Sequence, residues 1–342
     1  MVLGIISMSS LMAVVVPSML ADGDETVEAW IAGSFDANLL FTALLVEVAT
    51  GEIYRWFIQK NVTIKLPGAV PPAMSAQFTA LIPGFVTLIL FTVVRLLFAI
   101  TPWGGFPAFV SDVISRPLRG VGTSYVGTLL ACLMEHLLWS FGLHGSSVII
   151  FPIFEPLWIV NMSENITEGA RNIVTFTFYE NGVWIGGLGA TLAVVLYMMF
   201  FAKSELLKSI GRIGILPGLF NINEPVTFGL PIVLNPVLMV PYILAPIAAM
   251  TVQYVGTAVG LFPLCNNMVP WTTPVLISGF LTTGSFMGVV AQLCGLAAAM
   301  AVWLPFIRAY DKKCYREERA QEESVLVSKN AHCGRVSIHI SS

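Results

Sequence analysis

The amino-acid sequence predicts an all-α, polytopic membrane protein with several helical spans and two re-entrant hairpins. Hydrophobic residues make up 56% of the 342 residues and charged residues only 11%, whereas a soluble domain carries about a quarter charged residues. The stretch from Pro225 to Ile307 contains no Asp, Glu, Lys or Arg, and about 20 apolar residues suffice to cross a bilayer. These observations exclude a water-soluble fold.

Apolar runs bounded by charged and turn-forming residues mark the expected membrane spans. In chain order they cover residues 2–20, 35–54, 79–100, 121–141, 183–202, 236–262 and 283–307. The first run has no basic segment before it and no clear small-residue cleavage site after it, so it indicates a span rather than a signal peptide.

Two further apolar stretches, at about 145–161 and 214–234, are rich in Gly, Pro and Asn. Such residues release backbone groups that lipid cannot satisfy, and a broken backbone at membrane depth is tolerated where it lines a cavity. We therefore expect a re-entrant hairpin in each stretch. In the chargeless stretch, five prolines predict two full crossings and a broken segment around Trp271, because an interior proline removes a helical hydrogen bond.

The charged loops and the ends of the chain predict its orientation. The basic loop at 55–65 and the basic segment after Ile307 are expected inside the cell, and the acidic loop at 22–28 outside. Residues 203–212 have the pattern of a short amphipathic helix at the membrane surface. From about Glu317 the sequence is polar and aperiodic, which predicts a disordered tail.

The overall charge and the cysteines exclude several classes of function. The net charge is −3, so nothing indicates a nucleic-acid partner. The five cysteines show no C-x-x-C spacing, so neither a metal site nor a disulfide framework is indicated. We expect no metal and no cofactor.

Ionisable side chains inside apolar segments are candidates for function, because a charge at the centre of a bilayer is costly. The candidates are Glu47, Arg95, Glu135 with His136, His144, Glu155 and Glu224. Arg95 is close enough to the end of its run to reach the headgroups. Glu47 and Glu155 are interpreted as structural partners. Glu135 and His136 are about 100° apart on a helix, so at most one of them need be functional.

The segment Trp139 to Gly145, W-S-F-G-L-H-G, ends a predicted span. Two glycines flank His144, and glycine allows backbone to approach a ligand closely. Trp139 offers an indole face that can stack on the apolar face of a sugar ring. A histidine here is either a binding residue or a structural group, and the local sequence alone does not decide between them.

The segment Gly218 to Pro231, G-L-F-N-I-N-E-P-V-T-F-G-L-P, begins just before the chargeless stretch. Asn221, Asn223 and Glu224 supply amide donors and a carboxylate acceptor suited to hydroxyl groups. The alternative is that Glu224 caps the amides of its own loop. P-W-T-T-P, Pro270 to Pro274, places Trp271 in another interrupted segment.

Three motifs together resemble enzyme IIC, the membrane component of the lactose/cellobiose (diacetylchitobiose-type) family of the bacterial sugar phosphotransferase system. They are F-G-L-H-G at 141–145, N-I-N-E-P-V-T-F-G-L-P-I-V-L-N-P at 221–236 and P-W-T-T-P at 270–274. The sixteen-residue block around Glu224 is the most specific of the three. K-L-P-G-A-V-P-P-A-M-S-A-Q-F, at 65–78, also resembles a cytoplasmic segment of that family.

The resemblance implies a multi-span helical transporter in the bacterial cytoplasmic membrane that works as a homodimer. Residues 1–120 would form the oligomerisation scaffold, residues 121–308 the sugar-binding transport domain, and residues 309–342 the cytoplasmic tail. The expected substrate is a disaccharide such as cellobiose, lactose or diacetylchitobiose. A separate enzyme IIB, supplied by enzyme IIA, would phosphorylate it with a cysteine-bound phosphoryl group. Whether this transport subunit is itself counted as an enzyme stays open.

Carried over one position at a time, the resemblance implies sugar contacts at Trp139, His144, Asn223, Glu224 and Trp271. Glu224 would also orient the reacting hydroxyl or accept its proton. The resemblance covers about residues 1–310 and starts near the third helix of the family. The family's first two spans, with any glutamine-like sugar contact in them, are therefore expected to be absent, through a truncated product or a start codon assigned too late.

Two other classes of function are compatible with part of the sequence. An ion-coupled secondary transporter could use Glu224 and His144 as a proton relay. An intramembrane hydrolase would need a nucleophile with an oriented base, and the sequence contains neither G-x-S-x-G nor H-E-x-x-H. Dependence of uptake on a phosphoryl donor separates the ion-coupled transporter from the group-translocating one.

Overall fold

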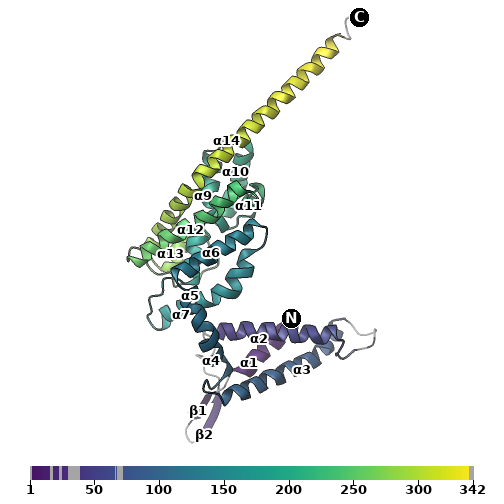
Figure 1. Ribbon diagram of the computed structural model, residues 1–342, viewed down its shortest axis with the longest axis vertical. Helices are drawn as coiled ribbons and strands as arrows, with labels where there is room; N and C mark the ends of the chain where they lie inside the picture. Colours follow the sequence, from purple (N-terminus) through teal and green to yellow (C-terminus); the bar gives the residue numbers. More distant parts are fainter. Residues whose placement is uncertain are drawn as a thin grey trace. The chain divides into compact units, whose positions relative to one another are not determined.

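The chain divides into two compact units, Met1–Gly122 and Thr123–Ser342, in a computed structural model (Figure 1). The structure describes residues 2–15, 18–22, 25–29, 39–65, 67 and 72–338. The sequence placed a domain boundary after residue 120. The roles predicted for the two parts, oligomerisation and sugar binding, stay predictions.

The first unit contains short and long helices and a β-hairpin. Its elements are α1 (Val2–Val14), β1 (Ser18–Asp22), β2 (Glu25–Ala29), α2 (Leu40–Gln59), α3 (Pro72–Ala99), α4 (Phe106–Val110), the π-helix η3 (Ser111–Ser115) and α5 (Arg116–Gly122). Helix α1 packs against both α2 and α3. Strands β1 and β2 pair antiparallel, with Ser18 opposite Ala29.

The predicted first span, 2–20, was wrong in its length. Helix α1 ends at Val14 after 13 residues, which at 1.5 Å per residue is about 20 Å and shorter than the roughly 30 Å hydrocarbon core. Residues 18–22 pair instead with β2, which contains most of the acidic stretch that was expected to be a loop. Hydropathy cannot reveal such a pairing between two segments.

The second unit is entirely helical in its described elements. These are α6 (Tyr125–Ser140), the π-helix η4 (Ser146–Phe154), α7 (Glu155–Thr167), α8 (Phe176–Val183), the 3-10 helix η5 (Leu188–Ala190), α9 (Leu192–Phe200), α10 (Glu205–Leu219), α11 (Glu224–Gly229), α12 (Pro236–Ala258), α13 (Ile277–Thr283) and α14 (Phe286–Ile338). Its core forms where α12, α14 and α9 meet. There Trp303 is fully buried, and its indole N–H donates to the backbone oxygen of Gly189 (2.9 Å).

Within the described ranges, four helices are long and apolar enough to cross a membrane. They are Ser75–Ala99, Ser146–Thr167, Pro236–Ala258 and Phe286–Ser324. Two interrupted helix pairs, Phe106–Gly122 with Tyr125–Ser140 and Phe176–Ala190 with Leu192–Phe200, raise the number to six if each pair is one span. The expected spans from residue 79 onward overlap these helices but extend beyond them at some ends; the largest extension is at 236–262, because helix α12 ends at Ala258. The prediction of a multi-span, all-α membrane protein is confirmed apart from the hairpin β1–β2.

The two stretches expected to form hairpins differ from each other. Residues 146–167 form one helix, so the break predicted at 145–161 was wrong. Pro152 lies inside the wider π-helical turn of η4, which accommodates its missing N–H. The stretch at 214–234 is broken, as predicted: α10 ends at Leu219, and only the six-residue α11 precedes α12.

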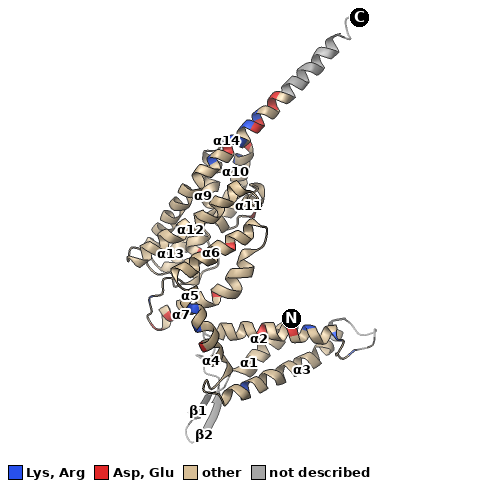
Figure 2. Ribbon diagram, viewed as in Figure 1, with Lys and Arg blue, Asp and Glu red and all other residues tan. Residues whose placement is uncertain are grey.

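The chargeless stretch contains two long helices and a broken segment between them, which confirms the prediction. Helix α12 retains Pro241 and Pro246 within its length. Residues 259–276, which include Trp271, are non-helical and lead into the short α13. In Figure 2, Lys, Arg, Asp and Glu appear along α14 only beyond its apolar part.

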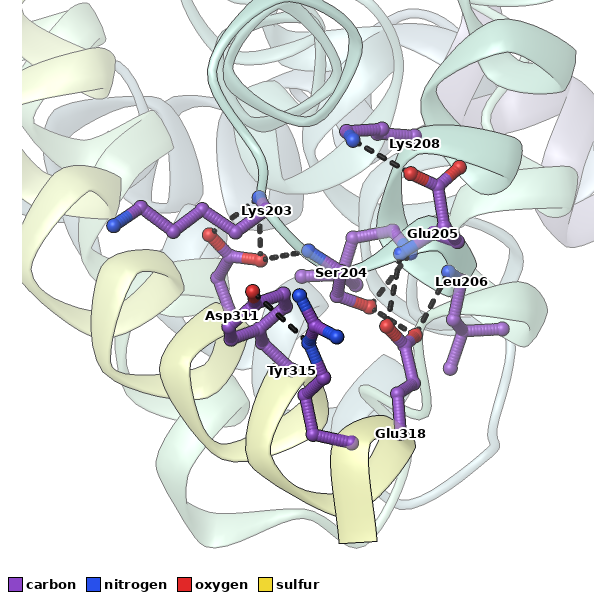
Figure 3. A network of polar contacts seen from close by, with 10 residues as sticks. Lys203, Ser204, Glu205, Leu206, Lys208, Asp311, Tyr315 and Glu318 are labelled. Carbon is purple, nitrogen blue, oxygen red and sulfur yellow. Dashed lines mark hydrogen bonds and ion pairs between the residues drawn. The ribbon is translucent and has the colours of Figure 1, made fainter. Parts of the chain in front are cut away.

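The tail beyond Glu317 is helical where the sequence predicted disorder, because α14 continues to Ile338. Glu, Lys, Arg, Ala and Gln are good helix formers even without an apolar stripe. Tertiary contacts also hold the first part of the charged segment, as Figure 3 shows. Asp311 accepts hydrogen bonds from the backbone N–H groups of Lys203 and Ser204 (3.0 and 2.9 Å). Glu318 accepts from Ser204 Oγ (2.6 Å), and so α14 is anchored at the start of α10.

Candidate functional site

A cavity of about 380 Å³ in the second unit brings together all five predicted sugar contacts, Trp139, His144, Asn223, Glu224 and Trp271. Its volume lies in the range of small-molecule binding sites. The other residues that line it are Ser146, Phe151, Glu155, Phe176, Glu180, Trp184, Gly187, Leu188 and Asn221. Three indoles, two further aromatic rings and three carboxyl groups therefore surround one space.

Trp139 and His144 lie at the end of α6 with their rings 4.6 Å apart between centroids. His144 Nδ1 accepts the backbone N–H of Ser147 (3.2 Å) and lies 2.9 Å from Ser147 Oγ. Because Nδ1 accepts an N–H, a neutral imidazole carries its proton on Nε2. The sequence suggested that glycine here lets backbone approach a ligand. Instead, a Cβ on Gly145 would lie 2.1 Å from the backbone oxygen of Glu135, so glycine permits close packing against α6.

Asn223 and Glu224 lie where the chain enters α11. Asn223 is buried, and its Nδ2 donates to the backbone oxygen of Leu188 (2.7 Å) instead of capping the helix. Gly187 makes room for it, because a Cβ there would lie 2.6 Å from Asn223 Cγ. The Glu224 side chain is exposed and lines the cavity. A carboxylate in this position can accept hydrogen bonds from a ligand.

Trp271 is 52% exposed and belongs to a segment that Asn221 holds in place. Asn221 Nδ2 donates to the backbone oxygens of Trp271 (2.7 Å) and Thr273 (3.2 Å). Its Oδ1 accepts the N–H of Gly186 (3.0 Å). Asn221 was expected to offer amide donors to a hydroxyl group, but its amide binds three backbone groups instead.

Glu180 and Trp184 are cavity residues that the sequence analysis missed. Glu180 lies on α8, and Trp184 follows the last residue of this helix. The predicted span began at residue 183, so Glu180 fell outside it and was not treated as a charge in an apolar segment. A span drawn from Phe176, where the apolar run of α8 begins, would have included it. Glu155, interpreted as a structural partner, also lines the cavity.

Glu135 and His136 are fully buried and do not line the cavity. The carboxylate of Glu135 accepts hydrogen bonds from Ser146 Oγ and from the Tyr179 hydroxyl, both at 2.6 Å. His136 Nε2 accepts the N–H of Gly189 (3.0 Å), so its Nδ1 carries the proton and donates to the backbone oxygen of Cys132 (2.8 Å). The pair fixes α6 against its neighbours.

The cavity suits a neutral ligand with apolar faces and a rim of hydroxyl groups. Aromatic rings pack against apolar C–H faces, and carboxylates and amides exchange hydrogen bonds with hydroxyl groups. Across the described ranges, no group of three or more His, Cys, Asp or Glu side chains is placed to hold a metal ion. Glu47 and Arg95 belong to the first unit and do not line this cavity.

Comparison with known proteins gives one consistent set of relatives. The family model described as "Phosphotransferase system, EIIC" matches residues 1–246. The putative permease IIC component YwbA of Bacillus subtilis (strain 168) is 44% identical over 290 residues, which cover 83% of this chain and 65% of that protein. The cellobiose-specific EIIC component of Geobacillus stearothermophilus is also 44% identical over 290 residues, covering 82% of this chain and 64% of that protein.

A relative that combines two components and a solved structure extend this set. The lactose-specific EIICB component of Lacticaseibacillus casei is 32% identical over 293 residues, covering 84% of this chain and 50% of that protein. The crystal structure of the transporter ChbC, the IIC component of an N,N'-diacetylchitobiose-specific phosphotransferase system, superposes with a TM-score of 0.81 at 36% identity. The match covers 92% of this chain and 76% of ChbC. The chain thus spans about 65% of the length of the first two relatives.

Proposed function

The chain belongs to the EIIC family of the phosphotransferase system, and on this premise we propose that it is a sugar permease component. It binds a disaccharide such as cellobiose, lactose or diacetylchitobiose and moves it inward across the bacterial cytoplasmic membrane. A partner enzyme IIB, itself supplied by enzyme IIA, then phosphorylates the sugar. The names of the relatives support this substrate class, since they specify cellobiose, lactose and diacetylchitobiose.

The observation that carries the proposal is the cavity in which the five predicted contacts meet. Trp139 and Trp271 provide apolar ring faces for the two sugar units. His144 presents Nε2–H as a donor, and Glu224 provides a charged acceptor. A hydrogen bond to a charged group is roughly twice as strong as a neutral one, so Glu224 is the strongest single contact in the proposed site.

Glu224 has a second role in the proposed phosphoryl transfer. A sugar hydroxyl attacks the phosphoryl group on the cysteine of enzyme IIB, so that an O–P bond forms and the S–P bond breaks. The thiolate leaves, and the hydroxyl proton passes to the Glu224 carboxylate. Catalysis of this reaction depends chiefly on positioning and charge stabilisation. A carboxylate already hydrogen-bonded to the hydroxyl supplies the positioning and accepts the proton.

The first unit is the proposed scaffold of a homodimer. Helix α3 carries large apolar side chains that are exposed on the single chain, among them Phe85 (61%), Ile89 (62%) and Leu96 (58%). In a membrane such side chains meet lipid or another helix. The proposal assigns part of this surface to a second copy of the chain and the rest to the bilayer.

Uptake of radiolabelled cellobiose with a choice of energy source tests the proposed function. Membrane vesicles that contain the chain and enzyme IIB receive either a phosphoryl donor or a proton gradient. The proposal predicts uptake and sugar phosphate with the donor only. Uptake driven by the gradient alone would support the ion-coupled alternative with Glu224 and His144 as relay, which family membership does not favour.

A further inference from the structure

The side chain of Gln292 on α14 uses every hydrogen-bonding position of its amide. It is buried, with 3% of its surface exposed. Its Oε1 accepts the backbone N–H groups of Leu276 (2.7 Å) and Gly279 (3.2 Å). Its Nε2 donates to Asn181 Oδ1 (2.8 Å) and Ser278 Oγ (2.9 Å). Since an amide offers two acceptor lone pairs and two donors, Gln292 is fully satisfied. We call Gln292 and these four partners the Gln292 hub.

Leu276 connects the Gln292 hub to the segment that contains Trp271. Its φ of 74° lies in the left-handed region, where a residue other than glycine is strained and persists only if its surroundings hold it. The hydrogen bond from its N–H to Gln292 provides that hold. On the other side of the segment, Asn221 binds the backbone of Trp271. Residues 270–276, here called the Trp271 segment, are therefore held by Asn221, by the bond from the Val275 N–H to the Leu219 oxygen (2.9 Å) and by the Gln292 hub.

Asn181 connects the same hub to the part of the cavity lining formed by Glu180 and Trp184, here called the α8 wall. It lies on α8, directly after Glu180 and one turn before Trp184, and both of these line the cavity. Its Oδ1 accepts from Gln292, and its Nδ2 donates to Thr282 Oγ1. The position of the α8 wall relative to α13 and α14 therefore depends on these amide contacts.

Gln292 itself lies behind the sugar cavity. It lines a narrow polar space of about 10 Å³, which shares Glu180, Trp184, Asn221 and Trp271 with the cavity. A space of this size holds about one water molecule, so a sugar ring cannot enter it. Any effect of Gln292 on sugar binding must therefore pass through its neighbours.

We propose that Gln292 is a positioning residue that sets the spacing between the Trp271 segment and the α8 wall, and through it the affinity for a disaccharide. This inference rests on the proposed function. Loss of the amide removes the bond that holds Leu276 in its left-handed conformation, and the Trp271 segment then relaxes away from the cavity. Helix α14 keeps its apolar packing around Trp303.

The test compares variants of the full chain in equilibrium binding of radiolabelled cellobiose. Gln292→Met keeps the length of the side chain and removes its hydrogen bonds. Gln253→Met is the matched control, because Gln253 is also 3% exposed and its Nε2 donates to Cys265 Sγ (3.4 Å), away from the Trp271 segment.

We expect Gln292→Met to weaken cellobiose binding by about tenfold or more, because the backbone N–H groups of Leu276 and Gly279 lose their acceptor. Gln253→Met should stay within about threefold of the wild type, since it leaves those N–H groups bonded to Gln292. Asn181→Leu removes the hydrogen bond between Gln292 and α8 and should cause a similar loss of affinity. This variant replaces Gln292→Met if Gln292→Met does not fold. Binding within threefold by both disruptive variants, or an equal loss in Gln253→Met, would overturn the proposal.

A second readout needs no sugar. Acrylamide quenching of Trp271 is obtained by subtracting the signal of a matched Trp271→Phe protein from that of each variant. We expect quenching of Trp271 to rise in Gln292→Met and to stay unchanged in Gln253→Met. Unchanged quenching of Trp271 in Gln292→Met would contradict the proposal that Gln292 holds the Trp271 segment in place. If the wild type binds no disaccharide, the proposed function fails, while this measurement still decides on the role of Gln292.

Discussion

The two long helices of the chargeless stretch and the broken segments beside them serve different purposes. Helices α12 and α14 pack around buried side chains such as Trp303 and Tyr242, and neither contributes a residue to the lining of the cavity as described. Residues 221–224 and 270–275 are not part of a long helix, and they carry Asn223, Glu224 and Trp271. The Asn221 amide holds residues 271–273, and the Gln292 amide holds Leu276 directly after them, by side-chain hydrogen bonds in place of helical ones. In this protein, polar side chains line the cavity at the points where the helices are interrupted.

Gly187→Ala should have the largest effect on binding, because Gly187 packs directly against Asn223 of a broken segment. The φ of Gly187 is 91°, and a Cβ there would lie 2.6 Å from Asn223 Cγ. Asn223 must move, and we expect cellobiose affinity to fall by about 100-fold, or roughly 2.7 kcal/mol. Equilibrium binding of cellobiose measures the loss.

Gly169→Ala is the control for this change. Gly169 also has a positive φ, 69°, but a Cβ there meets nothing within 4 Å. Both variants place a side chain at a positive φ, and only Gly187→Ala brings that side chain against a residue of the site. Equal losses of affinity in the two variants would show that strain, and not the displacement of Asn223, is responsible.

Asn221→Ala should weaken cellobiose binding by about tenfold, because three backbone groups lose their hydrogen-bond partner. These are the oxygens of Trp271 and Thr273 and the N–H of Gly186. Asn221→Asp keeps the acceptor for Gly186 and should fall between alanine and the wild type. An aspartate variant as weak as the alanine variant would mean that the bonds to the Trp271 segment account for the whole effect.

His144→Ala should have a smaller effect, a loss of about three- to tenfold, because it removes one neutral hydrogen bond to the sugar. Ser147→Ala sharpens this test. It removes the hydroxyl that lies 2.9 Å from His144 Nδ1 and leaves the backbone N–H that also donates to this atom. Binding by Ser147→Ala should therefore stay close to that of the wild type. Wild-type affinity in His144→Ala would identify His144 as a structural group.

Thr251→Val should have the smallest effect, since it alters the regular packing of α12 against α6. It removes the contact between Thr251 Oγ1 and the Tyr125 hydroxyl (2.8 Å). We expect a stability loss of about 1 kcal/mol in thermal unfolding and almost no change in cellobiose affinity. A loss of affinity as large as that of Asn221→Ala would remove the distinction between regular helices and broken segments.

Local chemistry made much of the site predictable from the sequence. Glu224 and Trp271 lie in short motifs crowded with proline and asparagine, and the prolines there remove helical hydrogen bonds. The absence of charge from Pro225 to Ile307 identified the membrane helices beside them. These features depend only on neighbouring residues, so no knowledge of the fold was needed.

Other features depend on contacts between distant segments and could not be predicted in this way. The pairing of β1 with β2 shortened the first predicted span, and the π-helical turn around Pro152 kept residues 146–167 helical. The role of Asn221 changed because its partners come from two other segments. The role of Gln292 could not be predicted either, because the sequence around a single glutamine in an apolar run does not indicate which distant residues it contacts.

The central claim is that Glu224 binds the sugar, and equilibrium binding of radiolabelled cellobiose to purified Glu224→Gln tests it most directly. The substitution keeps the shape and removes the charge, so we expect a loss of about 1.5–3 kcal/mol, the worth of a hydrogen bond to a charged group. Glu168→Gln is the matched control, because Glu168 is exposed and lies outside the cavity, and its affinity should equal that of the wild type. Unchanged affinity in Glu224→Gln, together with unchanged phosphoryl-dependent uptake, would contradict the claim.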